Sequence, residues 1–387
     1  MKIYKAYKFR MYPDKDTSAK INSFIGSSRF MYNCFLEKKE DRYKQGLNYD
    51  LKSMKEDVKV YTESYPWLKE VDSTALRNAI DDLDSAYTNF FKGRASHPRF
   101  KKKSINDKYK TNAIRSSYKG KNYSNIKVDI DTHTIKLPKL PLIKIKGYRS
   151  LKTFEDKKII NVTISRVSNR YYASVCVEED IPYNENVLNY AVGIDLGIKD
   201  LVVKSDGIKY KSMQDIDKLD RKLKGLNRWL SRSQKGSKNR DKIKSKIERV
   251  NLKIRNIRKF YTHLITKEIT NDYDLIVTEN LDTKGMIEKS SNKLLTKRII
   301  NSTFSKIIRQ LKYKGKWKNK KLIQIEKYYA SSQKCHRCDY QNKEVKDLSI
   351  RDWVCPKCGI ENDRDINASI NILWEGITKY YKEQYSN

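Results

Sequence analysis

The stretch VGIDLG at residues 192–197 decides how the second half of the chain folds, because it joins an apolar run to one acid, Asp195. Such a run predicts a buried strand, and LVV at 201–203 predicts a second strand. The turn residues SDG at 205–207 predict that the chain returns as a third strand. Further apolar strands are predicted at 275–279 and 322–325. Strands mixed with helices are typical of an α/β domain.

A long basic helix is predicted between these strands, from about 239 to 271. Its apolar residues recur at helical period and predict core packing. They are Ile243, Ile247, Val250, Ile254, Ile257, Tyr261, Leu264 and Ile265. The opposite face is lysine and arginine, and it either follows phosphates or is simply solvated, so that the sequence leaves both interpretations open. Helices are also predicted from about 302 and from 366.

The first half of the chain changes its hydrophobic period twice. Residues 4–11 predict a strand, and the next apolar residues recur at helical spacing. A second helix is predicted to start at Asp72, a plausible N-cap, and to end at Gly93. Alternating residues then predict strands at 126–137 and a hairpin of 162–166 with 171–177 across Ser168-Asn169. We therefore expect a helical insertion between the first strand and the rest of a β-barrel or sandwich.

The chain is strongly basic: 83 lysines and arginines oppose 47 acids, a formal net charge of +36 in 387 residues. Such an excess would repel itself in a compact state unless a polyanion accompanied it. The 27 tyrosines and 10 phenylalanines among these cations can stack on bases. Nucleic acid is therefore the predicted partner. The N-terminus is charged from the start, and no apolar run approaches the roughly 18 residues of a bilayer span, so we expect no membrane partner and a cytosolic protein.

Two CxxC pairs, Cys335 with Cys338 and Cys355 with Cys358, are separated by sixteen residues. This spacing allows four thiolates to bind one zinc ion tetrahedrally. With all four positions filled by sulfur, the metal has no open site and is expected to support folding and not catalysis. His336 lies inside the first pair and is interpreted as a bystander.

Three acids stand at the boundary of an apolar strand or at the start of a helix: Asp195, Glu279 and Asp365. Nucleases of the RNase H-like class gather carboxylates around divalent cations, which activate water and stabilise developing charge. Magnesium, or else manganese, is the metal that we expect, because these ions prefer oxygen ligands. Taken singly, each acid has an ordinary interpretation: a turn residue, a polar residue at a strand end and a helix N-cap. The three together favour a metal site.

Several motifs together resemble the TnpB (OrfB) family, which bacterial insertion sequences encode and which is related to the type V CRISPR effectors. They are GIDLGIKD at 193–200, ENL at 279–281, SSQKC at 331–335 and DRDINAS at 363–369. KAYKFR at 5–10 and PRFK at 98–101 extend the resemblance to nearly the whole chain. One departure is Asp339, where the family usually has glycine.

The resemblance implies a multidomain fold of α+β and α/β type. The first part would be a wedge-like β-barrel domain (1–12 plus 97–190) with an inserted helical recognition domain (13–96). The second part would be an RNase H-like RuvC nuclease domain (191–334 plus 359–387) interrupted by a zinc ribbon (335–358). The resemblance also implies that Asp195, Glu279 and Asp365 are the catalytic residues and bind magnesium, with Asp363 as the fallback for the third acid.

The family uses a guide RNA derived from the end of its own element, and it cuts double-stranded DNA that matches the guide beside a short motif. The resemblance therefore implies an RNA-guided DNA endonuclease of a bacterial transposable element, acting by metal-dependent phosphodiester hydrolysis in the cytoplasm. A monomer with bound RNA is expected, although the sequence leaves the oligomeric state open. Two alternatives are a nuclease-inactive, RNA-guided DNA-binding repressor and a transposase that performs strand transfer.

Overall fold

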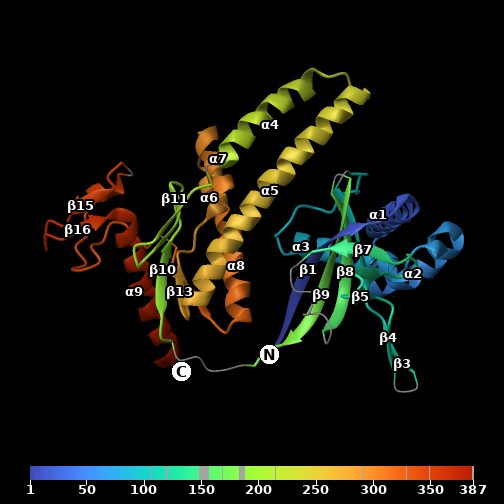
Figure 1. The fold of residues 1–387 in the computed structure, drawn as a ribbon, viewed down its shortest axis with the longest axis horizontal. Helices are drawn as coiled ribbons and strands as arrows, with labels where there is room; N and C mark the ends of the chain where they lie inside the picture. Colours follow the sequence, from blue (N-terminus) through green and yellow to red (C-terminus); the bar gives the residue numbers. More distant parts are fainter. Residues whose placement is uncertain are drawn as a thin grey trace. The chain divides into compact units, whose positions relative to one another are not determined.

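The chain forms two compact units, Met1–Ile181 and Pro182–Asn387, in a computed structural model (Figure 1). The structure describes residues 1–104, 106–118, 121–147, 157–167, 169–182, 188–213, 215–290, 292–327, 329–347 and 349–385. Within these ranges, no helix combines the length and the apolar character that a membrane crossing requires. The predicted hairpin turn at Ser168 lies outside the described residues.

The first unit is built on a seven-stranded sheet, all of whose pairs are antiparallel. In spatial order the strands are β2 (Asn106–Asn112), β8 (Lys158–Val167), β9 (Arg170–Asp180), β1 (Lys2–Tyr12), β7 (Ile143–Lys146), β6 (Thr134–Lys136) and β5 (Lys127–Asp129). Two more strands, β3 (Arg115–Tyr118) and β4 (Lys121–Ser124), pair with each other. The helices are α1 (Lys15–Lys44), α2 (Leu51–Ser64) and α3 (Ser73–Phe91), with a 3-10 helix at Pro66–Glu70.

The helices of the first unit follow β1 in the chain and share a core with the later strands. The ring of Phe24 on α1 packs edge-on against Tyr109 on β2, with the centroids 5.7 Å apart. Asp72 caps α3 by accepting a hydrogen bond from the Thr74 amide at 3.1 Å, and it also accepts one from Thr111 on β2. The predicted N-cap is therefore confirmed, and it joins the start of α3 to the sheet.

The second unit contains a five-stranded mixed sheet, a two-stranded ribbon and six helices among the described residues. In spatial order the sheet is β12 (Lys209–Lys211), β11 (Asp200–Lys204), β10 (Ala191–Asp195), β13 (Leu275–Thr278) and β14 (Lys321–Gln324). The ribbon pairs β15 (Asp352–Val354) with β16 (Glu361–Asp363), and a 3-10 helix lies at Glu344–Lys346. The helices are α4 (Asp215–Arg232), α5 (Lys238–Asp272), α6 (Thr283–Glu288), α7 (Lys293–Ser302), α8 (Phe304–Trp317) and α9 (Arg364–Tyr385).

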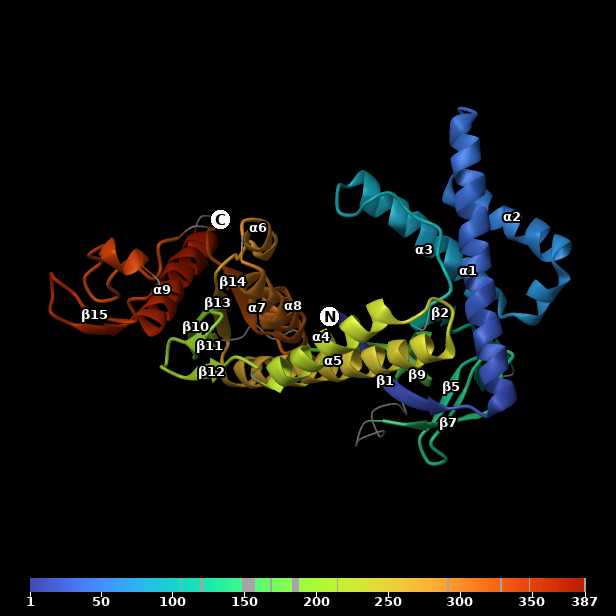
Figure 2. The same cartoon turned by 90° about the horizontal axis from the view of Figure 1, so that it is seen from above.

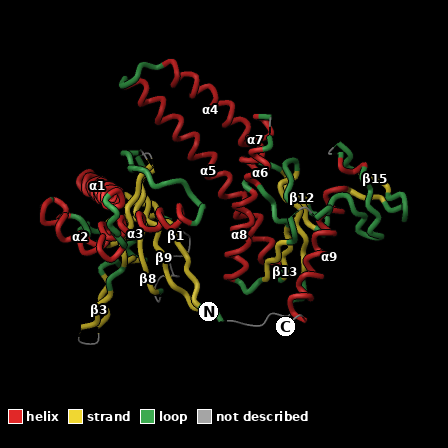
Figure 3. The backbone as a smooth tube through the Cα atoms, turned by 180° about the vertical axis from the view of Figure 1, so that it is seen from behind, coloured by secondary structure: helices red, strands yellow, loops and turns green. Residues whose placement is uncertain are grey.

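Different helices cover the two faces of this mixed sheet (Figures 1 and 3). Val192 and Ile194 of β10 pack in one core with residues of α5 and α8, such as Ile265 and Leu311. Val277 of β13 packs in a separate core, which includes residues of α9. The helices α4 and α5 form a long hairpin that extends from the sheet (Figure 2). The predicted basic helix at 239–271 is thus confirmed as α5, and α9 is the helix predicted from 366.

Candidate acidic site and cysteine cluster

Asp195 and Glu279 lie at the same end of the sheet and face the same side of it. The strands β10 and β13 are parallel, with Gly193 beside Val277 and Ile194 beside Thr278, so the two acids are the next residues along. Because side chains alternate between the faces of a strand, both acids share the face of Val277, which α9 covers. The structure therefore places Asp195 at the last position of a strand and Glu279 directly after its neighbour.

The helix α9 lies close to these strands because two glycines leave room for it. A Cβ atom on Gly193 would lie 2.0 Å from the carbonyl oxygen of Ser369, and one on Gly376 would lie 2.2 Å from Val277 Cγ1. The backbone of α9 therefore packs directly on β10, and the backbone of Gly376 packs on β13. Asp365 lies about one turn before Ser369, so the same contact brings the start of α9 towards Asp195.

The environment of Asp195 and Glu279 disfavours their charges. Burial, together with the negative charges of Glu279 and Asp365, raises the pKa of Asp195 to about 8. Burial also raises the pKa of Glu279, against a hydrogen bond that Ser331 Oγ donates to its Oε1 at 2.5 Å. Like charges raise a pKa only over short distances, so Glu279 and Asp365 both lie close enough to Asp195 to disfavour its charge. A divalent cation would relieve this repulsion, and three carboxylates are the oxygen donors that magnesium prefers.

Asp363 and Asp365 make different contacts at the start of α9. Asp363 Oδ1 accepts hydrogen bonds from the amides of Asp365 at 3.1 Å and Ile366 at 3.0 Å, so Asp363 and not Asp365 is the helix cap. Burial raises the pKa of Asp363, but an ion pair with Lys209 and these amides outweigh burial and lower it. Asp365 accepts hydrogen bonds from Arg351 Nη1 at 3.2 and 3.3 Å. The N-cap interpretation of Asp365 is therefore wrong.

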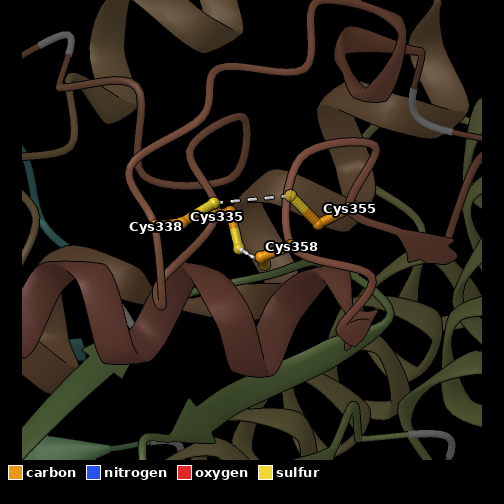
Figure 4. Close-up of side chains that lie close together, drawn as sticks. All are labelled: Cys335, Cys338, Cys355 and Cys358. Atoms are coloured by element: carbon orange, nitrogen blue, oxygen red, sulfur yellow. Dashed lines mark hydrogen bonds between the residues drawn. The ribbon is translucent and has the colours of Figure 1, made fainter.

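The four cysteines come together as the predicted spacing requires (Figure 4). Their four sulfur atoms all lie within 4.8 Å of one another. In the described part of the chain no other side chains form such a group, and the three acids are therefore farther apart. The Sγ atoms of Cys335 and Cys358 are 3.7 Å apart, and those of Cys338 and Cys355 are 3.6 Å apart. A tetrahedral zinc ion with bonds of about 2.3 Å would separate its sulfur ligands by about 3.8 Å. The cluster therefore fits zinc.

The two CxxC turns have the same backbone geometry. The amide of Asp339 donates to the Cys335 carbonyl at 3.0 Å, and the amide of Gly359 donates to the Cys355 carbonyl at 2.9 Å. Both residues have positive φ, +57° at Asp339 and +71° at Gly359. The aspartate thus stands where the left-handed conformation favours glycine, and the four ligands remain in place around it.

Side chains of α9 hold the cysteine segment against the acidic site. Asn371 Nδ2 donates to the Ser331 carbonyl at 2.8 Å, and the hydroxyl of Ser331 donates to Glu279. Asn367 Oδ1 accepts from the His336 amide at 2.9 Å and lies 3.1 Å from His336 Nδ1. His336 is therefore engaged with α9 and lies outside the cysteine group, as its interpretation as a bystander predicted. The sequence analysis included Ser331 in a family motif but did not predict its contact with Glu279, and it missed Arg351, because neither contact follows from local spacing.

Three family models match separate parts of the chain. The model described as "Helix-turn-helix domain" of OrfB proteins matches residues 1–48, where the structure has β1 and the single helix α1. The model described as "Probable transposase" matches residues 174–290, and the model described as "Cas12f1-like, TNB domain" matches residues 304–372. The last match includes all four cysteines and Asp365, whereas Asp195 and Glu279 lie in the match at 174–290.

A solved Cas12f1 structure, determined as a complex with sgRNA and target DNA, matches 96% of this chain and 98% of its own, with a TM-score of 0.53 at 14% identity. The chain therefore has the mixed α/β fold of the Cas12f1 class. A protein of Escherichia coli K12 named "Putative RNA-guided DNA endonuclease InsQ" is 30% identical over 97% of this chain and 93% of its own. A Streptomyces pristinaespiralis protein named "Putative RNA-guided DNA endonuclease" is 28% identical over 97% and 90%. The chain belongs to the TnpB (OrfB) family.

Proposed function

We propose that this chain is an RNA-guided DNA endonuclease of a bacterial transposable element, which cuts guide-matched DNA beside a short adjacent motif. The observation that carries this function is the alignment with relatives named RNA-guided DNA endonucleases over nearly the whole of both chains. The strong positive charge of +36 supports a nucleic-acid partner, because an RNA–DNA duplex would neutralise it. The guide RNA and the double-stranded target are the partners that we propose.

The cutting site that we propose is the trio of Asp195, Glu279 and Asp365 in an RNase H-like, RuvC-type domain. Magnesium, or manganese in its place, would activate water there and stabilise the charge that develops on the phosphate. The chain's own contribution is to bury Asp195 and Glu279 at the end of the sheet, with Asp365 near enough to raise the pKa of Asp195. Ser331 orients Glu279, while Asp363 holds the first turn of α9. The contact between Arg351 and Asp365 supplies a positive charge at the third acid.

Zinc is the metal that we propose for the four cysteines. Four thiolates leave no open coordination position, so the ion would fold the segment 335–358 and not take part in cleavage. The hydrogen bonds between the segment 331–336 and Asn367 and Asn371 of α9 then join the folded ribbon to the acidic site. We therefore propose that loss of zinc impairs cleavage indirectly, through the position of Glu279 and Asp365.

The domain boundaries stay a proposal as well. A wedge-like barrel of 1–12 plus 97–190 with a helical insertion at 13–96 is supported by the pairing of β1 with β9, from Lys2 beside Asp180 to Met11 beside Tyr171. A nuclease domain of 191–334 plus 359–387 is supported by the packing of α9 on β10.

The function is tested by expressing the chain together with the DNA that flanks its gene. The copurifying RNA is sequenced, and the complex is mixed with magnesium and a plasmid that matches the guide. We expect a discrete RNA from the element end and guide-dependent cleavage. Asp195→Ala, Glu279→Ala and Asp365→Ala should each abolish cleavage with RNA binding retained, because only the metal-held transition state is lost. RNA without cleavage would point to a guided repressor, and no specific RNA would contradict the guided function.

A further inference from the structure

Two rows of basic residues face each other where α5 packs against α8. The α5 row is Lys259, His263 and Lys267, and the facing row is Lys306 and Lys314 of α8 with Lys318 directly after the end of that helix. Residues four apart lie on one side of a helix, about 6 Å apart along its axis. We call the five lysines of these two rows the cationic ladder. It belongs to the second unit alone, and Figure 1 shows the two helices side by side.

The rows interlock through neutral hydrogen-bond acceptors. Lys314 is only 8% exposed, and its Nζ donates to the His263 carbonyl at 2.9 Å and to Thr266 Oγ1 at 2.7 Å. Lys318 Nζ donates to Thr270 Oγ1 at 3.1 Å. These partners orient the two ammonium groups without neutralising them.

Few acidic side chains neutralise the positive charge of the ladder. In the described residues none of its five lysines forms an ion pair, whereas the nearby Lys320 is paired with Asp274 at 2.6 Å. Burial, together with the charges of Lys318 and Lys267, lowers the pKa of Lys314 to about 8. Burial and then Lys314, Lys259 and Lys306 lower the pKa of His263 to about 4. Burial, Lys267 and Lys320 lower the pKa of Lys318, and Asp272 offsets part of this effect.

Exposed apolar side chains lie beside the ladder on α5. Phe260 is 71% exposed and Leu264 is 48% exposed, and the two are four residues apart. Cations in rows with an exposed aromatic ring beside them are typical of a surface that binds single-stranded nucleic acid, because the rows hold phosphates and the ring stacks on a base.

We propose that the cationic ladder of α5 and α8 binds the phosphates of an unpaired segment of the guide RNA, with Phe260 stacked on one of its bases. The proposal rests on the guided function and names the surface that holds the guide. Lysines held together without acids cost folding free energy for as long as the chain is folded. The polyanion that compensates them must therefore stay bound, as a guide RNA does and a target DNA does not.

The ladder is separate from the acidic site. The helices α5 and α8 pack in the core on one face of the sheet, whereas the side chains of Asp195 and Glu279 face α9 on the other. A variant of the ladder therefore changes RNA binding without touching the carboxylates or the cysteines.

The test compares two triple variants of the full chain. The ladder variant carries Lys259→Glu, Lys267→Glu and Lys306→Glu, which remove no hydrogen bond described above. The control variant carries Lys343→Glu, Lys346→Glu and Lys382→Glu, three exposed lysines that make the same change in charge elsewhere in the unit. The probes are a single-stranded RNA copied from the DNA that flanks the gene and a DNA of the same sequence, each titrated at several salt concentrations. Circular dichroism and zinc content report on folding.

We expect the ladder variant to bind the RNA about tenfold more weakly or worse, and the slope of log affinity against log salt to fall by about 2, at roughly 0.7 per lost phosphate contact. Lysine-to-arginine changes at the same three positions should keep the affinity. Equal losses in the ladder and control variants would overturn the proposal, and so would a loss confined to the DNA probe. Failure of the guided function would instead appear as a wild-type chain that carries no element RNA and does not cut, whatever the ladder variant does.

Discussion

The carbonyl oxygen of Ser369 on α9 occupies the space that a side chain on Gly193 of β10 would need, with only 2.0 Å between that oxygen and a Cβ atom on Gly193. The glycine lies two residues before Asp195, and the serine lies four residues after Asp365. One backbone contact therefore sets the distance between two of the three acids. If the three acids form the cutting site that we propose, this site depends on the close approach of α9 to β10 as much as the core does.

Gly193→Ala should push α9 away from the sheet. Overpacking of this kind costs about 1–3 kcal/mol, and we expect the midpoint of thermal unfolding to fall accordingly. Cleavage should fall more than stability suggests, because the start of α9 carries Asp365. The measurements are thermal unfolding and single-turnover cleavage of a guide-matched DNA.

Gly225→Ala is the matched control, because a Cβ atom on Gly225 of α4 would meet no atom within 4 Å. It should stabilise the chain slightly, by about 0.5–1 kcal/mol, since alanine favours the helix. Similar losses of cleavage in both glycine variants would show that the Gly193 contact does not position the acids.

The positions of the acids could be predicted from the sequence, but their separate roles could not. Asp195 and Glu279 each stand at the end of an apolar run, so the sequence predicts both at strand ends, but only the register of β10 beside β13 puts them on one face. The pattern NDRD does not say which aspartate caps α9, because either spacing suits a helix start. Only the observed hydrogen bonds of Asp363 to the amides of α9 assign it. Likewise Arg351 and Ser331 contact the acids from distant parts of the sequence, so no local pattern predicts these contacts, although Ser331 belongs to a family motif.

Asp339→Gly should strengthen the cysteine cluster. The residue has φ +57°, a left-handed conformation that costs an L-residue roughly 1 kcal/mol and costs glycine almost nothing. We expect slower loss of zinc to a chelator and a higher unfolding temperature. The reverse change in the second turn, Gly359→Asp, should act in the opposite direction, because Gly359 has φ +71° at the equivalent position. If Asp339→Gly instead weakened zinc retention, the aspartate side chain would have a role of its own.

Asp195→Asn should stabilise the metal-free protein. The aspartate is desolvated and repelled by Glu279 and Asp365, so its charge costs folding free energy until a cation arrives. With chelator present, we expect the variant to exceed the wild type by roughly 1–3 kcal/mol in urea unfolding. Added magnesium should then stabilise the wild type more than the variant, because only the wild type has the full set of carboxylates. A variant less stable than the wild type in chelator would contradict the proposed crowding of charge.

The sequence could not predict the cationic ladder, for a different reason. The apolar stripe of α5 and its basic opposite face follow from periodicity, but the sequence left open whether that face follows phosphates or is solvated. The decisive feature is the packing of Lys314 from α8 against the His263 carbonyl of α5, 51 residues earlier. Which cations meet across two helices depends on the crossing angle and the register of the helix pair, and the sequence of one helix predicts neither.

Lys314 should make the stability of the free chain depend on pH in the alkaline range. Its pKa is lowered to about 8 by burial and then by Lys318 and Lys267, against an ordinary value of about 10.4. Between these two values the unfolded chain binds the proton and the folded chain does not, so stability rises as pH rises through this window. Below about pH 8 both states are protonated, and the full cost of the buried charge is present.

Lys314→Met should remove that rise while keeping most of the side chain's volume. We expect the variant to gain stability relative to the wild type near neutral pH and to lose that advantage towards about pH 10, as urea unfolding at a series of pH values would show. The difference between the two proteins isolates Lys314 from the other lysines of the ladder, because these titrate in both. A constant difference across the range would mean that Lys314 keeps its ordinary affinity for the proton in the fold. RNA bound to the ladder should flatten the wild-type curve, since phosphates that neutralise the neighbouring lysines make the ammonium group of Lys314 less costly to keep.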